Sequence, residues 1–329
     1  MKHLALVFLC LTVLTGLRAE EAKADSIRQY TLRVIKVVAE RPGQSIGSLT
    51  LKPLQKGIDD SPMNLREALE HVPGISATTG TKDESNLRIR GFRKNEVKIL
   101  IDGRPLTGSY FGNVDLNNIA LSGIKEAIII KGPGSAVYGS GTMGGVVNLI
   151  TRAPTNQDWL TLGLSAKRNN NNSIELTGSH SFENWDFLVY GSRDNSEGAV
   201  LSDDFEPTAY ENGGVRNNSR KQGYSFQSRW GATIAGFHQL GLNLGLNYIP
   251  RKEIASSIYE AKYRLYEDWA RAQGSLSYSY ELAPNTSLDA LLYFDEARDH
   301  YFEYNDSAYQ IMNVDSQMQS RLWGFNPKL

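Results

Sequence analysis

The chain has 329 residues, of which 40% are hydrophobic and 22% charged, and its formal net charge is −1. A nearly neutral chain gives no electrostatic reason to expect a nucleic-acid partner. After residue 20 no apolar run approaches the ~20 residues of a membrane-spanning helix, which excludes a helical membrane protein. A membrane β-barrel passes this test, because its strands alternate lipid-facing and lumen-facing residues.

Residues 1–19 have the pattern of a secretory signal peptide. A basic start precedes the apolar run Leu4–Leu14, and small residues follow it. The run is too short to span a membrane. We expect cleavage after Ala19 or, as a second choice, after Ala24. The single cysteine, Cys10, would leave with the signal, so the mature protein would have neither a disulfide nor a thiol nucleophile.

Residues 20–42 form a polar segment with one β-rich stretch before Pro42. That stretch consists of Thr31, Leu32, Arg33, Val34, Ile35, Lys36, Val37 and Val38. Two interpretations are open. It can be an edge strand of the domain that follows, or an extended segment that adds as a strand to a partner protein.

A short amphipathic helix is predicted over residues 64–71. Leu65, Ala68 and Leu69 share one of its faces, and prolines delimit it on both sides. His71, at its end, could be a metal ligand, but a single histidine there is more often a cap.

Residues 87–154 contain short strands and a glycine-rich stretch. The strands are predicted over Leu87–Arg93, Val97–Ile101, Ile124–Lys131 and Val146–Ile150. From residue 132 to residue 145 the chain reads GPGSAVYGSGTMGG. Glycine at this density indicates backbone that turns tightly, often at positive φ, or passes close to another segment.

Nucleotide binding and catalysis are poor interpretations of this stretch. A dinucleotide fingerprint needs a following helix, whereas here the chain continues into another strand, and no Gly-Lys-Ser/Thr is present for a P-loop. Ser135 and Tyr138 have no histidine near them in sequence. We interpret them as a turn serine and a packed tyrosine, and we predict no catalytic residue.

Several motifs of this region resemble, in the same order, the plug domain of TonB-dependent outer-membrane receptors. They are Ile89–Gly91, Leu100–Pro105, Gly132–Gly139 and Gly144–Thr151, with Val72–Gly74 after the helix. The resemblance implies a plug domain over residues 43–153. It implies turns at Gly91, Gly103, Gly132, Gly134, Gly139, Gly144 and Gly145.

The resemblance also suggests a role for the β-rich stretch near the N-terminus. Residues 31–38 have the position and composition of the TonB box, which pairs with the periplasmic protein TonB by strand addition. Lys36 and Val38 depart from the family's usual V-V-V-T-A pattern at Ile35–Ala39. The alternative remains an edge strand of the plug.

Two polar loops resemble the plug apices that face outward in this family. These are Thr78–Asn86 and Leu106–Asn113, and the second carries adjacent aromatic residues. An aromatic pair at a loop tip is either a substrate contact or packing beneath a barrel loop. The predicted substrate-binding residues are Thr79, Thr81, Lys82, Ser109, Tyr110, Phe111 and Asn113.

Four arginines of the predicted plug also have two interpretations. Arg88, Arg90, Arg93 and Arg104 can contact substrate, or they can pair with acidic side chains of the inner barrel wall. A plug inside a polar lumen needs polar, dissociable contacts. We therefore favour wall contacts for all four.

From residue 154 the sequence predicts part of an antiparallel transmembrane β-barrel. Tight joints such as Glu183-Asn184 alternate with long ones such as Asp194–Gln222, as expected for periplasmic turns and extracellular loops. Eight strands are predicted over Trp159–Lys167, Ser173–Phe182, Trp185–Arg193, Gly223–Ile234, Gln239–Pro250, Asp268–Leu282, Thr286–Arg298 and Gln319–Lys328. The aromatic residues near their ends suit interfacial girdles, although a β-sandwich core would also use them.

The acidic run Asp203–Glu206 lies in a long predicted loop. It could hold Ca²⁺, but it lacks regular ligand spacing, and a solvated acidic turn is the better interpretation. We predict no metal site and no resident cofactor.

The predicted fold class is mainly β, a small α+β plug followed by an antiparallel transmembrane β-barrel. The resemblance implies an outer-membrane receptor, not an enzyme, that takes up a ferric siderophore or otherwise cobalamin or haem, with TonB as partner. Different hypotheses are a secreted β-sandwich enzyme or adhesin, and a non-functional remnant. The family's barrel is of the ~22-stranded plugged type, and an eight-stranded barrel cannot enclose a plug, so we expect this chain to be truncated.

Overall fold

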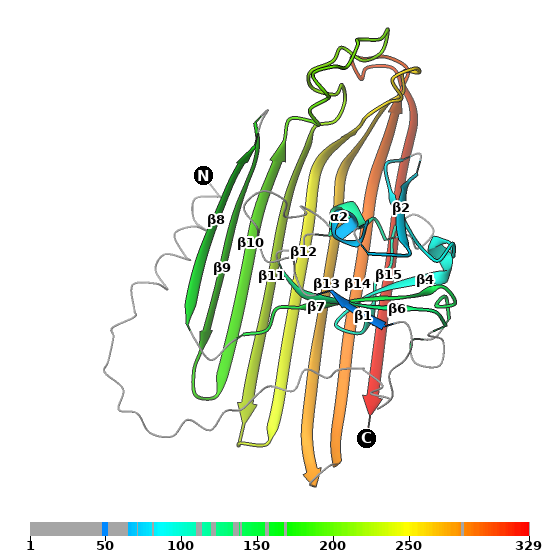
Figure 1. Cartoon of the computed structure of the whole chain (residues 1–329). Coiled ribbons are helices and arrows are strands. Elements are labelled where there is room, and N and C mark those ends of the chain that lie inside the picture. The colour runs from blue at the N-terminus through cyan, green and yellow to red at the C-terminus, as the bar shows by residue number, and fades with distance from the viewer. Residues whose placement is uncertain are drawn as a thin grey trace. The chain divides into compact units, whose positions relative to one another are not determined.

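A computed structural model describes residues 48–51, 65–70, 72–80, 82–109, 114–119, 123–133, 138, 140–154, 158–167, 170–283 and 286–328. They belong to one compact unit, built from two groups of strands (Figure 1). We call the part within residues 48–154 the small domain, and the strands within residues 159–328 the large sheet. The predicted signal peptide and the stretch Thr31–Val38 lie outside the described residues.

The small domain is built around a five-stranded sheet in the order β1-β6-β7-β4-β5. Its strands are β1 (Ser48–Leu51), β4 (Val97–Ile101), β5 (Arg104–Pro105), β6 (Ile124–Lys131) and β7 (Gly145–Thr151). Strands β4 and β7 are parallel, and the other neighbours are antiparallel. The remaining elements are the hairpin β2 (Ile75–Thr79) and β3 (Ser85–Ile89), the helix α2 (Leu65–Glu70), and the 3-10 helices η1 (Lys94–Glu96) and η2 (Leu116–Asn118).

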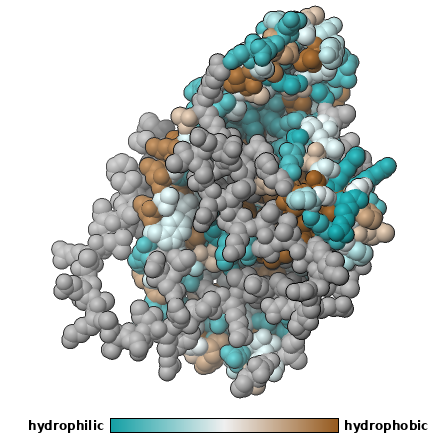
Figure 2. Space-filling view, viewed as in Figure 1, coloured by the Kyte–Doolittle hydropathy of each residue, from teal (hydrophilic) through white to brown (hydrophobic). Residues whose placement is uncertain are grey.

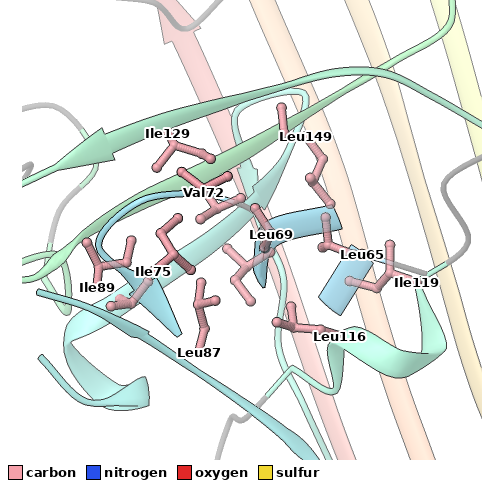
Figure 3. Close-up of a cluster of buried hydrophobic side chains, with 14 of the residues drawn as sticks. Leu65, Leu69, Val72, Ile75, Leu87, Ile89, Leu116, Ile119, Ile129 and Leu149 are labelled. Carbon is pink, nitrogen blue, oxygen red and sulfur yellow. The ribbon is translucent and has the colours of Figure 1, made fainter. Parts of the chain in front are cut away.

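A single hydrophobic core holds these elements together (Figure 3). Leu65 and Leu69 of α2 are 1% and 0% exposed, which confirms the predicted apolar face of this helix. They belong to the same cluster as Ile129 of β6 and Leu149 of β7. Burial of such side chains contributes about 1.5–3 kcal/mol each. No helix among the described residues is long and apolar enough to cross a membrane.

The strand predicted over Leu87–Arg93 is shorter than expected and ends at Ile89. Arg90 and Gly91 adopt positive φ angles of 52° and 85°, which turn the chain out of the extended conformation. The loop predicted over Thr78–Asn86 is likewise narrower, because its outer residues pair in the β2–β3 hairpin. The pairing ends at Thr79 and Ser85.

The large sheet consists of eight strands, each antiparallel to the next in sequence. They are β8 (Trp159–Lys167), β9 (Asn171–Ser181), β10 (Trp185–Ser196), β11 (Lys221–Ile234), β12 (His238–Ile254), β13 (Tyr263–Ala283), β14 (Thr286–Tyr304) and β15 (Met312–Lys328). The predicted mainly β fold, with a small α+β domain before an eight-stranded antiparallel sheet, is confirmed.

The two faces of the large sheet differ in chemistry. On β12, Leu242, Leu244 and Leu246 alternate along one face and are 38–45% exposed. The residues between them are smaller or polar, Asn243 and Gly245. This period of two is the pattern of a strand with one lipid-facing side.

The two ends of the large sheet also differ. At the tight-turn end, aromatic rings cluster: Phe182 stacks on Trp185 at a centroid distance of 3.9 Å, and Phe187 on Trp230 at 5.2 Å. At the other end, the loop of residues 197–220 contacts the loop of residues 255–262, since Thr208 donates to the Ile258 carbonyl at 2.8 Å. Hydrophilic and hydrophobic residues are intermixed over the loops at the top of the view (Figure 2).

Two predicted long loops are largely strand. Arg251–Glu267 and Asp299–Met318 were assigned to connections, yet β12 continues to Ile254 and β14 to Tyr304. The ladder persists through pairs such as His300↔Gln317. Apolar alternation fails there because polar residues occupy both faces, although the backbone remains paired. Periodicity alone therefore placed the strand ends too early.

Candidate functional site: the contact between the small domain and the large sheet

The turn of the β2–β3 hairpin contacts the large sheet through Lys82. Its Nζ lies 4.2 Å from the ring centroid of Tyr301 on β14, a cation–π geometry. Glu84 shapes the turn, since its carboxylate accepts a hydrogen bond from the Lys82 backbone N–H at 3.0 Å. Thr79, at the end of β2, accepts one from the Arg66 guanidinium at 2.9 Å.

The second predicted apex reaches the same strand of the large sheet. The Ser109 hydroxyl donates a hydrogen bond to the Asp299 carboxylate of β14. The structure therefore brings Lys82 and Ser109 to residues 299 and 301, on one face of one strand. The other predicted substrate contacts, Thr81, Tyr110, Phe111 and Asn113, lie outside the described residues.

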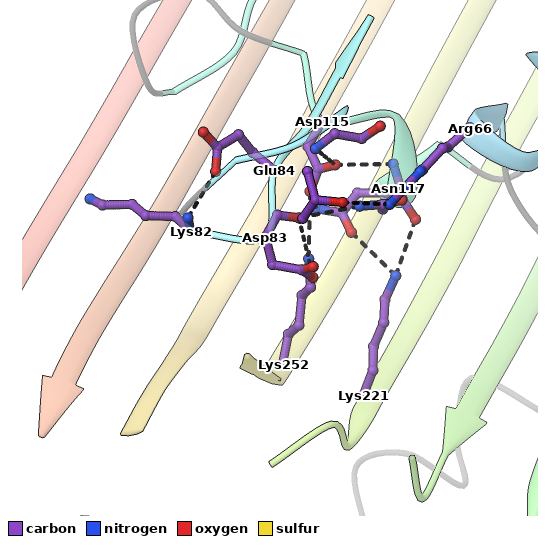
Figure 4. Close-up of polar contacts among 11 residues, drawn as sticks. Arg66, Lys82, Asp83, Glu84, Asp115, Asn117, Lys221 and Lys252 are labelled. Atoms are coloured by element: carbon purple, nitrogen blue, oxygen red, sulfur yellow. Dashed lines mark hydrogen bonds and ion pairs between the residues drawn. The ribbon is translucent and has the colours of Figure 1, made fainter. Parts of the chain in front are cut away.

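Lys252 of β12 joins two loops of the small domain to the large sheet (Figure 4). Its buried Nζ lies 2.8 Å from Asp83 Oδ2 and 3.6 Å from Asp115 Oδ2. Asp115 caps η2 and also accepts the Ser85 N–H at 3.0 Å, so it couples η2 to the hairpin. A buried ammonium with two carboxylates is a strong attachment as long as both partners stay in place.

Lys221 extends this attachment to the neighbouring strand, β11. It pairs with Lys252 in the β11–β12 register, and its Nζ donates to the Asn117 carbonyl at 3.1 Å and to Asn118 Oδ1 at 3.2 Å. Two adjacent lysines repel each other, and the neighbouring carboxylates offset that repulsion. We call the group Asp83, Asp115, Lys221 and Lys252 the lysine latch.

A second attachment, on β13 and β14, is fully buried. Arg271 and Asp295 are each 3% exposed at the side chain, and Nη1 lies 3.0 Å from both carboxylate oxygens. Both side chains also bind the backbone of Thr107: Asp295 accepts its N–H at 2.7 Å, and Arg271 donates to its carbonyl oxygen. One residue of the small domain is thus held from both sides by an ion pair of the large sheet.

Among the four arginines, Arg104 is buried within the small domain. It donates to the Ile101 carbonyl at 3.1 Å and to Asp102 Oδ2 at 3.3 Å. Burial lowers the pKa of its guanidinium, while the Asp102 charge acts in the opposite direction. Asp102 also accepts the Thr151 hydroxyl, which in turn accepts a hydrogen bond from Arg229 of β11.

The other three arginines lie on the surface of the small domain. Arg90 donates to the Lys131 carbonyl at 3.3 Å. Arg93 precedes η1, and its backbone N–H donates to Glu96 at 2.8 Å. Arg88 is exposed. Direct contacts of these arginines with a barrel wall stay a prediction.

Several predicted turn glycines adopt conformations that favour glycine. Gly91, Gly103, Gly132 and Gly145 have positive φ angles of 85°, 79°, 137° and 147°. At Gly144, a Cβ would approach Phe92 Cβ to 2.3 Å. Gly134 and Gly139 lie outside the described residues.

Sequence reasoning missed every large-sheet residue of this contact. Lys221, Lys252 and Asp299 were assigned to long loops that the structure shows to be strand. Arg271 and Asp295 lie inside strands that were assigned only by their apolar residues. The missed signal is the alternation on the face opposite to the apolar one. On β14, residues at every second position of that face are buried: Asp295, Ala297, Asp299 and Tyr301. Charged residues at that spacing indicate a polar surface that is covered by another part of the chain.

The described residues contain no group of three or more His, Cys, Asp or Glu side chains arranged to hold a metal ion. Asp203, Asp204 and Glu206 are exposed in the loop of residues 197–220 and form no such group.

Residues 41–146 match the family model of the TonB-dependent Receptor Plug Domain. The matched residues form a TonB-dependent receptor plug domain. The small domain is accordingly a plug of this type, and the recognition made from the sequence motifs is confirmed.

One curated relative is the vitamin B12 transporter BtuB of Vibrio vulnificus (strain CMCP6), 29% identical over 197 residues. That alignment covers 59% of this chain and 32% of the relative, so the chain matches about a third of the relative's length.

Solved structures of receptors and transporters share the fold. One is the copper transporter OprC, with a TM-score of 0.67 and 16% identity over 85% of this chain and 42% of that one. Another is the FrpB iron transporter of Neisseria meningitidis, with a TM-score of 0.65 and 20% identity over 84% of this chain and 44% of that one. A third is the siderophore receptor PiuA of Acinetobacter baumannii, with a TM-score of 0.61 and 16% identity over 86% of this chain and 42% of that one.

Proposed function

We propose that this chain is part of an outer-membrane receptor that takes up a scarce metal chelate, with a ferric siderophore as the first candidate. Transport through such a protein requires a plug that is held in the wall yet can be displaced. The observation that best supports this is the polar nature of the contact between plug and large sheet. The hydrogen bond at Ser109 and the ion pair at Asp115 can exchange with water when the plug moves.

Cobalamin is the second candidate substrate. The curated relative described above is named as a vitamin B12 transporter, whereas the siderophore and iron proteins share the fold at lower identity. Both candidates belong to one mechanism, in which the chelate binds over the plug apices and a periplasmic partner displaces the plug.

We further propose that the lysine latch senses the substrate. Lys82 is a predicted substrate contact, and the next residue, Asp83, binds Lys252. A ligand that draws the hairpin outward would lengthen the Asp83–Lys252 ion pair. Binding at the apex would thereby weaken the attachment of the plug to β12 without any covalent step.

Replacing Ile35 by proline tests the proposed energisation by TonB. We expect uptake to fail while surface binding of the substrate persists, because proline removes a backbone donor and fixes φ in the segment proposed to add as a strand. Uptake and binding of radiolabelled substrate should be measured in the full-length receptor. Ile35→Val is the matched control, and unimpaired uptake by the proline variant would refute this role for residues 31–38.

Replacing Tyr110 and Phe111 together by alanine tests the proposed substrate site. We expect binding to weaken by about 1–3 kcal/mol, because aromatic rings contribute stacking or cation–π contacts with a chelate. Binding should be compared for ferric catecholates, ferric hydroxamates, haem and cobalamin, with resistance of the plug to protease as the folding control. Unchanged binding together with a protease-sensitive plug would show that the pair only packs.

A further inference from the structure

The outward face of strands β9–β12 contains a groove of about 400 Å³ near the long-loop end. Its centre is Gly191 of β10, which pairs with Leu176 of β9 and Phe226 of β11. Because glycine has no side chain, backbone forms the floor there, and the two large neighbours form the walls. Leu246 of β12, opposite Phe226 in the register, continues the apolar lining.

The two ends of the groove are chemically different. The apolar side chains Ile174, Leu176 and Phe226 are 45–50% exposed. At the long-loop end lies Arg193, which pairs with Ile174 and with Tyr224. Arg193 is exposed. Tyr224 accepts a hydrogen bond from Gln222 at 3.1 Å, so this end is also polar.

We propose that this groove binds one lipid of the outer leaflet, with an acyl chain over Gly191 and a headgroup phosphate on Arg193. The inference rests on the proposed outer-membrane location. In membrane barrels the long loops are extracellular, which places Arg193 at the outer headgroup level. The volume of the groove lies in the ~300–1,000 Å³ range of small-molecule sites. Arginine suits a phosphate because its planar fork donates two parallel hydrogen bonds.

The groove can be filled without disturbing the strand. A Cβ built on Gly191 would lie 4.0 Å from its nearest neighbouring atom, the Ser225 carbonyl oxygen. Gly191→Leu should therefore fold and occupy the acyl-chain position. Gly178→Leu is the control on β9, because Gly178 shares the outward face of Leu176 but does not line the groove. An added Cβ there would lie 3.2 Å from Leu160 Cδ1, the end of an exposed side chain that can shift.

The test uses the folded full-length receptor in detergent, titrated with diphosphorylated lipid A and monitored by native mass spectrometry. We expect wild type and Gly178→Leu to retain one lipid, and Gly191→Leu to bind it at least tenfold more weakly. Arg193→Gln should lose the preference for lipid A over its dephosphorylated form, and Arg193→Lys should keep part of it. Inorganic phosphate alone should not compete at millimolar concentration, since the acyl chain supplies part of the affinity.

Equal binding by wild type and Gly191→Leu would overturn the groove assignment, and equal retention of both lipid forms by wild type would overturn the phosphate assignment. Competition by inorganic phosphate would mean that Arg193 is only an anion site. Heat-modifiable migration on a gel and fractionation with the outer membrane are measured in the same variants. A protein that fractionates as soluble would refute the proposed location instead, which keeps the two failures distinct.

Discussion

Arg271→Met is expected to weaken the attachment of the plug by about 3–5 kcal/mol, because it leaves the Asp295 carboxylate buried without its ionic partner. The Asp295 side chain is only 3% exposed, so water cannot replace the guanidinium without opening the contact. The Thr107 carbonyl loses a donor in the same variant. The measurement is the urea concentration at which the plug becomes accessible to protease in the full-length receptor.

Arg298→Met is the matched control for this experiment. Arg298 and Asp268 also form an ion pair between β14 and β13, at 3.2 Å, but their side chains are 53% and 50% exposed. An exposed pair contributes about 0–1 kcal/mol, so little change is expected. The double variant Arg271→Met with Asp295→Leu should recover much of the loss, because no buried charge remains. Equal effects of the two arginine variants would contradict this account.

Gly145→Ala is expected to unfold or loosen the plug. Gly145 begins β7 at a φ of 147°, and a Cβ there would lie 2.3 Å from the Ile130 carbonyl oxygen of the paired strand. The backbone conformation and the clash together should cost about 2–6 kcal/mol. The measurement is protease sensitivity of the plug together with its thermal unfolding.

Gly132→Ala separates the two causes. Gly132 has a similar φ of 137°, but an added Cβ would meet nothing within 4 Å. This variant should therefore show the cost of the backbone conformation alone, about 1–3 kcal/mol. If both variants are equally destabilised, the steric contact with Ile130 has no role.

The two attachments differ in what can open them. The lysine latch is partly accessible, since the Asp83 side chain is 37% exposed while that of Lys252 is 6% exposed. The Arg271–Asp295 pair is closed to water on both sides. Solvent or ligand can therefore reach the first before the second. This order is consistent with a hairpin that responds to substrate while Thr107 stays fixed.

The sequence by itself determined the elements and their order. Ile124–Lys131 and Trp159–Lys167 were predicted with the bounds that the structure has, because apolar periodicity and flanking glycines act locally along the chain. The glycine motifs predicted the turns of the plug for the same reason, since a positive φ is a property of one residue.

Only the tertiary structure decided which charges meet. Thr107 and Asp295 are 188 positions apart, and Asp83 and Lys252 are 169 apart, so no local pattern relates them. Lys252 was assigned to a loop, and Arg271 lies within a strand whose outward residues alone carried the apolar signal. Their role follows from the face they occupy and from the domain that covers that face. The ends of β12 and β14 were also decided in this way, because backbone pairing with neighbouring strands continued where the side-chain pattern had stopped.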